Sequence, residues 1–141
     1  MTTGVLANLH ALDVGCGLGD NAEALAAAGA KTIAFDLSPN AIDWAKRRFP
    51  RSTVDYRAAD LFDPPSEWRG AFDLVHECYT LQALPADLLE PAFAALAATL
   101  KPKSELLVVA RARNEDQTMA GPPWPLPRSA FDLARAAGLR L

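Results

Sequence analysis

The stretch DVGCGLGD, residues 13–20, decides the fold of this chain. An apolar segment typical of a β-strand precedes it, and an alanine-rich segment typical of a helix follows it. Glycine at positions 15, 17 and 19 permits a tight turn and lets backbone N–H groups approach a bound molecule without a Cβ in the way. The stretch therefore predicts a strand–turn–helix unit that binds a ligand beside the start of its helix.

Asp20 indicates which kind of ligand this turn suits. A dinucleotide-binding turn follows the pattern G-x-G-x-x-G, and its third glycine would stand where this chain has Asp20. A carboxylate there would repel a pyrophosphate, so a dinucleotide-dependent oxidoreductase is the less favoured alternative. The turn instead suits a ligand with a cationic amino acid end, a ribose and no phosphate.

Residues Leu12 to Gly19 resemble the first motif of class I methyltransferases, a hydrophobic residue followed by D/E-x-G-x-G-x-G. These enzymes use S-adenosyl-L-methionine (SAM) as cofactor. The resemblance implies a SAM-binding loop made by Asp13, Gly15, Cys16, Gly17 and Gly19. A glycine-rich turn in another α/β protein is the alternative.

Strand and helix patterns alternate along the rest of the chain. We expect strands at 10–14, 31–35, 53–57, 72–78 and 105–110, and helices at 21–28, 39–49, 88–100 and 129–137. The last strand is expected to be buried on both faces, because it is continuously apolar. Right-handed crossovers then give a single α/β domain over residues 1–141, a Rossmann-like, doubly wound parallel sheet whose ligand lies at the carboxyl ends of the strands.

Acidic residues follow the second and third expected strands. Asp36 lies at the spacing where a carboxylate accepts from both ribose hydroxyls, with Leu37 beside the adenine; the alternative is an aspartate that caps the helix after Ser38. Asp60 resembles the family's adenine-contacting acid, and Leu61 would supply a backbone donor and an apolar wall. An ordinary turn aspartate is the alternative for Asp60.

The fourth expected strand carries the candidates for catalysis. Its opening FDLV, residues 72–75, resembles the corresponding family strand. Glu77 and Tyr79 fall nearest the strand end, where methyl donor and acceptor would meet. Glu77 would hold the cationic end of SAM or take a proton from the acceptor, or would merely pair with a loop, and Tyr79 would form a cofactor or substrate wall. His76 points to the opposite face and is expected to pack under a helix.

Two short segments resemble a narrower group, the thiopurine and thiol/halide methyltransferases. They are VHECYTLQALP at residues 75–85 and GPPWPL at residues 121–126. The resemblance implies a small-molecule acceptor, with a thiol as the acceptor group, which needs little help from a base. Trp124 would then be a substrate lid, or a tryptophan packed on its own prolines.

Composition excludes several classes of function. With a net charge of −3 over 141 residues, the chain lacks the basic excess of a nucleic-acid-binding surface. We find no apolar run long enough to span a membrane, no signal sequence and no metal-ligand spacing. Cys16 and Cys78 are expected to be reduced, packed residues of a cytoplasmic protein, with a redox pair as the alternative.

The chain departs from the family pattern at both ends. It reaches the glycine motif almost at once, and residues 138–141 resemble the opening of a sixth strand. We therefore expect a domain truncated at both ends, without the helix before the first strand or the last two strands. The strand at 105–110 would be an exposed edge, which a homodimer would cover. A non-catalytic SAM-binding or interaction module is accordingly the main alternative function.

Overall fold

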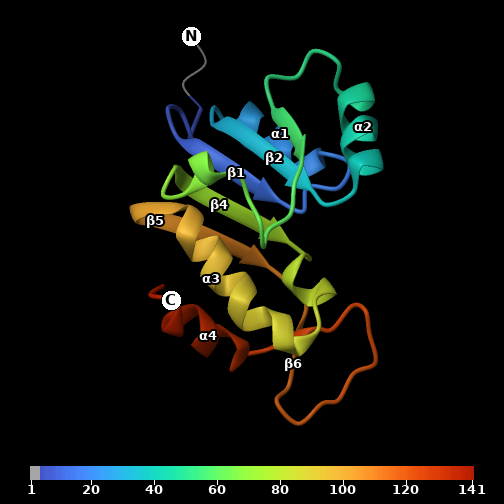
Figure 1. Ribbon diagram of the computed structural model, residues 1–141, viewed down its shortest axis with the longest axis vertical. Helices are drawn as coiled ribbons and strands as arrows, with labels where there is room; N and C mark the ends of the chain where they lie inside the picture. The colour runs from blue at the N-terminus through green and yellow to red at the C-terminus, as the bar shows by residue number, and fades with distance from the viewer. Residues whose placement is uncertain (1–3) are drawn as a thin grey trace.

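Five parallel strands form the central sheet of the computed structural model, which describes residues 4–141 (Figure 1). The strands are β1 (His10–Val14), β2 (Lys31–Asp36), β3 (Asp55–Ala58), β4 (Phe72–Cys78) and β5 (Leu100–Val109). Their order across the sheet is β3-β2-β1-β4-β5. The chain thus winds outward from β1 to β3, returns to β4 on the other side of β1, and creates a switch point between β1 and β4.

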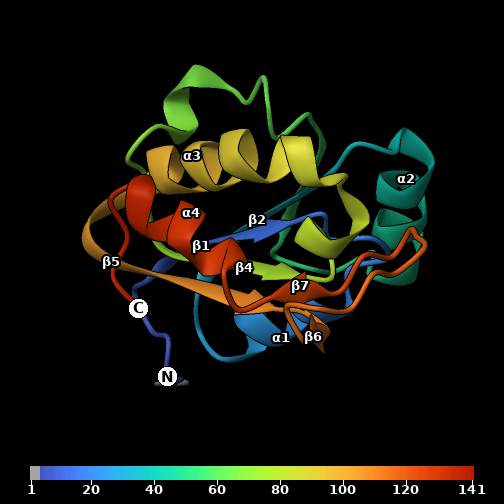
Figure 2. The same cartoon turned by 90° about the horizontal axis from the view of Figure 1, so that it is seen from below.

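Helices cover both faces of the sheet. In Figure 2, α3 (Leu89–Thr99) and α4 (Ala130–Ala136) lie on one face, and α1 (Asp20–Ala27) lies on the other. The helix α2 (Pro39–Arg48) shares a buried cluster with α1, β2 and β3 that includes Ala22, Ile42 and Tyr56. The larger cluster lies under α3 and includes Leu12, Val75 and Phe93. This three-layer arrangement confirms the predicted Rossmann-like fold.

Local sequence explains where α2 begins. The Ser38 hydroxyl accepts the N–H of Ala41 at 3.3 Å, and Pro39 occupies the first helical position, where its missing N–H costs least. β3 begins at Asp55 and not at the expected residue 53. The N–H of Val54 donates to the Ser52 hydroxyl at 3.0 Å, so this end of the segment bonds to a side chain outside the sheet.

The last strand differs from its prediction. β5 begins at Leu100, and its residues alternate between partly buried and exposed, so the expectation of burial on both faces was wrong. Leu107 and Val109 are 50% and 38% exposed, because β5 is the edge of the sheet and no described element covers their face. Within the described residues, 138–141 form no strand.

A long loop follows β5 and is closed by a short pair of strands that the sequence did not predict. β6 (Ala112–Arg113) pairs in parallel with β7 (Leu126–Pro127). The Arg113 guanidinium donates to the carbonyl oxygens of Asn114, Gln117 and Pro125, at 2.8–3.1 Å. One arginine thus organises the backbone of much of the loop.

Candidate functional site

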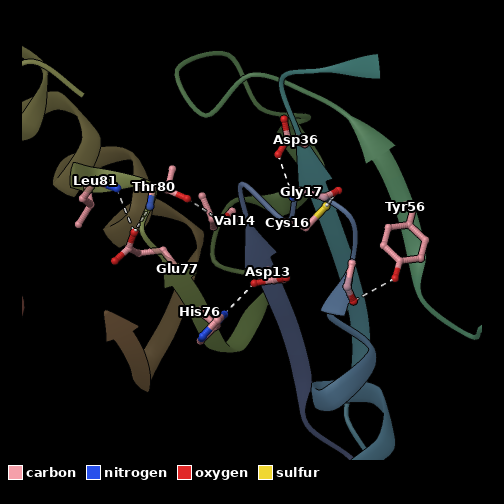
Figure 3. Close-up of polar contacts among 11 residues, drawn as sticks. Asp13, Val14, Cys16, Gly17, Asp36, Tyr56, His76, Glu77, Thr80 and Leu81 are labelled. Atoms are coloured by element: carbon pink, nitrogen blue, oxygen red, sulfur yellow. Dashed lines mark hydrogen bonds and ion pairs between the residues drawn. The ribbon is translucent and has the colours of Figure 1, made fainter. Parts of the chain in front are cut away.

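The carboxyl ends of β1, β2 and β4 meet around the glycine loop (Figure 3). Backbone hydrogen bonds order the loop: the N–H of Cys16 donates to Phe35 O in β2 at 2.9 Å, and the N–H of Gly19 donates to Cys16 O at 3.0 Å. Gly17 lies at the middle of the loop with φ +54°, and a Cβ added there would meet no atom within 4 Å. The middle of the loop therefore faces open space.

Asp36 connects the end of β2 to this loop. Its Oδ2 accepts the N–H of Gly17 at 2.9 Å (Figure 3). Its Oδ1 accepts the N–H of Ser38 at 2.9 Å. Asp36 thus bonds the residue that caps α2 and also faces the glycine loop, and Ser38, not Asp36, is the cap of α2. The ribose role of Asp36 stays a prediction. Each carboxylate oxygen has more than one acceptor site, so these bonds leave capacity for a ligand hydroxyl. Leu37 is 71% exposed beside it.

The residues after β3 differ from the expected arrangement. Asp60 is exposed, and its Oδ1 accepts the N–H of Phe62 at 2.9 Å, as a turn aspartate does. Leu61 packs into the main core and is only 9% exposed, so the expectation that its side chain forms a ligand wall was wrong. The neighbouring Phe62, 43% exposed, presents an apolar surface there instead.

Asp13 and His76 form a buried pair beneath the loop. They are neighbours in the β1–β4 register, and Asp13 Oδ1 lies 2.7 Å from His76 Nδ1 (Figure 3). Asp13 is 2% exposed and its Oδ2 has no hydrogen-bond partner among residues 4–141. Asp13 was expected to contact the cofactor, but this burial favours support of the loop from below. His76 lies packed inside, as expected.

Glu77 was expected to be a catalytic base or a ligand of the cationic end, and its position contradicts that. It is 0% exposed, and its Oε2 accepts the N–H groups of Thr80 and Leu81, each at 3.0 Å (Figure 3). Alternation along β4 directs it toward the α3 face, where burial raises the pKa of its carboxyl above the ordinary value despite these bonds. Glu77 therefore caps the turn after β4 from inside the core.

Tyr79 remains at the surface of the same turn. It has a positive φ of 64°, is 54% exposed, and donates its N–H to Val109 O at 2.8 Å. A left-handed backbone is unfavourable for a tyrosine, and such strain is found most often at functional sites. This position leaves its side chain available to a ligand at the β4 end.

Asp20 does not act as the free anion that the sequence suggested. Arg48 donates to both of its carboxylate oxygens, at 2.9 and 3.0 Å, and also donates to Leu18 O at 2.8 Å. The arginine lowers the pKa of the Asp20 carboxyl below its ordinary value. The charge argument against a pyrophosphate is accordingly weaker than predicted. Arg48 lies 28 residues away in sequence, and no local pattern marks it as a partner of the loop.

Tyr56 supports the far end of the loop and was also missed. Its hydroxyl donates to Glu23 Oε1 at 2.7 Å and lies 3.4 Å from Gly19 O. A Cβ at residue 19 would overlap this phenol, so glycine is required there by close approach as well as by its φ of +95°. Burial and the neighbouring Glu23 raise the pKa of Tyr56, which keeps it a donor.

The two cysteines are free thiols, and their surroundings make them poor nucleophiles. Burial, with Asp13 and Asp36 nearby, raises the pKa of Cys16 to about 12. Burial also raises the pKa of Cys78.

The loop that carries Trp124 packs on itself. The backbone N–H of Trp124 donates to Gln82 O at 2.6 Å, and a Cβ at Gly121 would overlap the indole ring. Gln82 Oε1 also accepts the N–H of Arg111 at 2.7 Å, which joins the loop to the segment after β4. These contacts favour a tryptophan packed within its own loop over a free lid.

Neither a metal site nor a membrane-spanning helix is found among residues 4–141. No group of three or more His, Cys, Asp or Glu side chains is arranged to hold a metal ion. In the same residues, no helix is both long enough and apolar enough to cross a bilayer.

Known proteins resemble the chain in sequence. Residues 11–103 match the family described as Methyltransferase domain. The chain is 36% identical over 105 residues to the ubiquinone biosynthesis O-methyltransferase of Xanthomonas campestris pv. campestris, a match that covers 73% of this chain and 43% of that protein. The chain thus spans less than half the length of this curated relative.

Solved structures resemble it in fold. A TehB-like SAM-dependent methyltransferase from Corynebacterium glutamicum superposes with a TM-score of 0.71, at 23% identity, over 93% of this chain and 65% of that one. The [4+2]-cyclase SpnF superposes with a TM-score of 0.79, at 24% identity, over 96% of this chain and 53% of that one. At these identities the structures establish the fold alone. The sequence match to residues 11–103 establishes the family, and the chain belongs to the class I SAM-dependent methyltransferases.

Proposed function

We propose that this protein transfers a methyl group from SAM to a small-molecule acceptor. The observation that carries the proposal is the contact between Asp36 and Gly17, which brings a carboxylate to a glycine loop at the switch point of the sheet. A ligand there would meet the open face of the loop on one side and an acceptor for ribose hydroxyls on the other.

The described residues fit SAM. The open space at Gly17 would receive its amino acid and ribose portions, Asp36 would accept from the ribose hydroxyls, and the exposed Leu37 and Phe62 would flank the adenine. Gly15, Cys16 and Gly19 would contribute backbone groups, and Asp60 an acceptor for the exocyclic amine. When bound, SAM supplies an activated methyl group, so the protein has chiefly to align the acceptor and exclude water.

Two acceptor atoms are supported by different observations. A thiol is supported by the burial of His76 and Glu77, because a thiol ionises readily and needs no base from the protein. An oxygen is supported by the relative named as an O-methyltransferase, which shares 36% identity over 105 residues. In either case we assign Tyr79, exposed at the β4 end, as a wall of the acceptor site.

The experiment has two stages. Calorimetric titration of the purified chain with S-adenosylhomocysteine (SAH), with NADH as control, tests the cofactor site. Transfer of label from methyl-tritiated SAM to matched acceptors, thiophenol and phenol among them, tests the reaction and the acceptor atom. Binding of SAH without transfer to any acceptor supports the non-catalytic SAM-binding alternative. Binding of NADH in place of SAH overturns both.

The oligomeric state, the location and the class of substrate are inferred from the surface of the protein and from its cysteines. The unpaired edge of β5, with Leu107 and Val109 exposed, supports pairing with a second copy of the chain, which sedimentation analysis tests. Two free cysteines support a reducing, cytoplasmic location, and the net charge of −3 supports a small-molecule substrate over a nucleic acid.

A further inference from the structure

The segment after β4 touches the glycine loop through the side chain of Thr80. Its Oγ1 donates to Val14 O at 3.1 Å (Figure 3). A Cβ at Gly15 would overlap the same hydroxyl, so Thr80 lies against the first turn of the loop. Gly15 has a φ of +63°, and the Thr80 side chain fills the space that a side chain at residue 15 would need.

Thr80 is itself fixed from inside the core. Its N–H donates to Glu77 Oε2 at 3.0 Å, and the next N–H, that of Leu81, donates to the same oxygen at 3.0 Å. Tyr79, the residue before Thr80, donates its own N–H to Val109 O. Because Glu77 is 0% exposed and Tyr79 is tied to β5, the Thr80 hydroxyl has little freedom to move relative to the sheet.

The other contacts to the loop come from the opposite side. Asp36 reaches Gly17 from β2, and Tyr56 reaches Gly19 from β3. In the sheet order, β2 and β3 lie on one side of β1 and β4 lies on the other. Thr80 therefore joins the cofactor loop to the strand that ends at the acceptor side.

We propose that Thr80 is a positioning residue that fixes the first turn of the cofactor loop relative to the β4 end. That this positioning serves catalysis rests on the proposed function, because in-line methyl transfer depends on the alignment of donor and acceptor. Whether the Thr80 hydroxyl holds the loop in place can be tested without any ligand.

The test compares two substitutions at Thr80 with one elsewhere. Thr80→Val removes the hydroxyl and keeps the shape, and Thr80→Ser keeps the hydroxyl. Thr99→Val is the matched control, since Thr99 is 3% exposed and donates its Oγ1 to Leu96 O at 2.7 Å, at the end of α3. Thermal unfolding of all three variants measures the general loss of stability.

Amide hydrogen exchange of Cys16 and Gly19 reports the loop directly. In Thr80→Val we expect both amides to exchange about 10-fold faster than in the wild type, while Thr80→Ser and Thr99→Val leave them within about twofold. Equal exchange in Thr80→Val and Thr99→Val would overturn the proposal.

Titration with SAH separates this inference from the proposed function. If the wild type binds SAH, Thr80→Val should weaken binding about 2- to 12-fold, a loss typical of one hydrogen bond, and Thr80→Ser should restore it. Unchanged affinity in Thr80→Val would overturn the role of Thr80 in cofactor positioning. If the wild type binds no SAH, the proposed function fails, and amide exchange alone decides whether Thr80 holds the loop.

Discussion

Asp36 accepts the backbone N–H of Gly17 at 2.9 Å, so the carboxyl end of β2 is bonded to the middle of the loop that follows β1. The two residues lie 19 positions apart in sequence and on adjacent strands of the sheet. This bond shapes the loop, and the same carboxylate is the one proposed above to accept from the ribose hydroxyls.

Asp36→Ala should weaken SAH binding by about 10- to 150-fold, because hydrogen bonds to a charged group contribute about 1.5–3 kcal/mol. Asp36→Asn retains one acceptor oxygen and should fall between the wild type and Asp36→Ala. Calorimetric titration measures both variants. Asp43→Ala, which removes an exposed carboxylate from α2, should bind SAH as the wild type does. Equal affinity in Asp36→Ala and Asp43→Ala would remove Asp36 from the site.

Gly17→Ala should abolish SAH binding while the protein stays folded. Its Cβ would project into open space within the described structure, so the substitution costs only the strain of a positive φ, roughly 1–2 kcal/mol. Gly138→Ala is the matched control, because Gly138 has a φ of +92° and open space around its Cβ but lies after α4. Urea unfolding should show similar losses of stability, and titration should show that Gly138→Ala alone binds SAH. Tight SAH binding by Gly17→Ala would argue against this loop as the cofactor site.

The sequence predicted correctly the features that depend on residues close together along the chain. The glycine turn, Asp36 and the bounds of β1 and β4 follow from spacing and apolar pattern, and the structure has them there. Alternation along β4 also predicted that His76 and Glu77 face opposite sides. Which of the two faces opens to the cleft depends on where α3 packs, and the alternation along β4 does not predict that packing. Glu77 consequently looked like a base and is a buried cap.

The contacts that sequence could not predict join residues far apart along the chain. Arg48 neutralises Asp20, Tyr56 lies under Gly19, and Thr80 lies against Gly15, and each pair is brought together by the crossovers of the fold. No spacing rule relates an arginine at the end of one helix to an aspartate at the start of another. The exposure of β5 agrees with its expected place at the edge of the sheet, whereas its apolar run alone is typical of a central strand and led to the wrong expectation of burial on both faces.

Cys16 should resist alkylation in the folded protein. A rise in its pKa from 9.0 to about 12 lowers the thiolate fraction near neutral pH about 10³-fold, and the thiolate is the reactive form. Mass spectrometry after timed exposure to iodoacetamide at pH 7.5 measures the rate at each cysteine. In guanidinium chloride, Cys16 should react as an ordinary cysteine. Rapid modification of Cys16 in the folded chain would show that its site is more open or more basic than the structure indicates.

Glu77→Gln should retain methyl transfer and change the pH dependence of stability. A lost general base would reduce turnover about 10²- to 10⁴-fold, whereas a buried cap replaced by its neutral isostere should reduce it about threefold or less. Glu77→Ala, in contrast, should lose about 1–3 kcal/mol of stability, because the N–H groups of Thr80 and Leu81 lose their acceptor.

The pH dependence follows from the raised pKa of Glu77 in the folded state. Between its unfolded pKa of 4.5 and the higher folded value, the folded protein holds a proton that the unfolded chain has released. The free energy of unfolding therefore falls as the pH rises through that window, and it stays lowered above the folded pKa. In Glu77→Gln this fall should be missing, whereas Glu90→Gln, an exposed change on α3, should keep it. Urea unfolding from pH 4 to pH 8 measures the difference, and parallel curves for Glu77→Gln and the wild type would mean that the pKa of Glu77 is the same in the folded and unfolded protein.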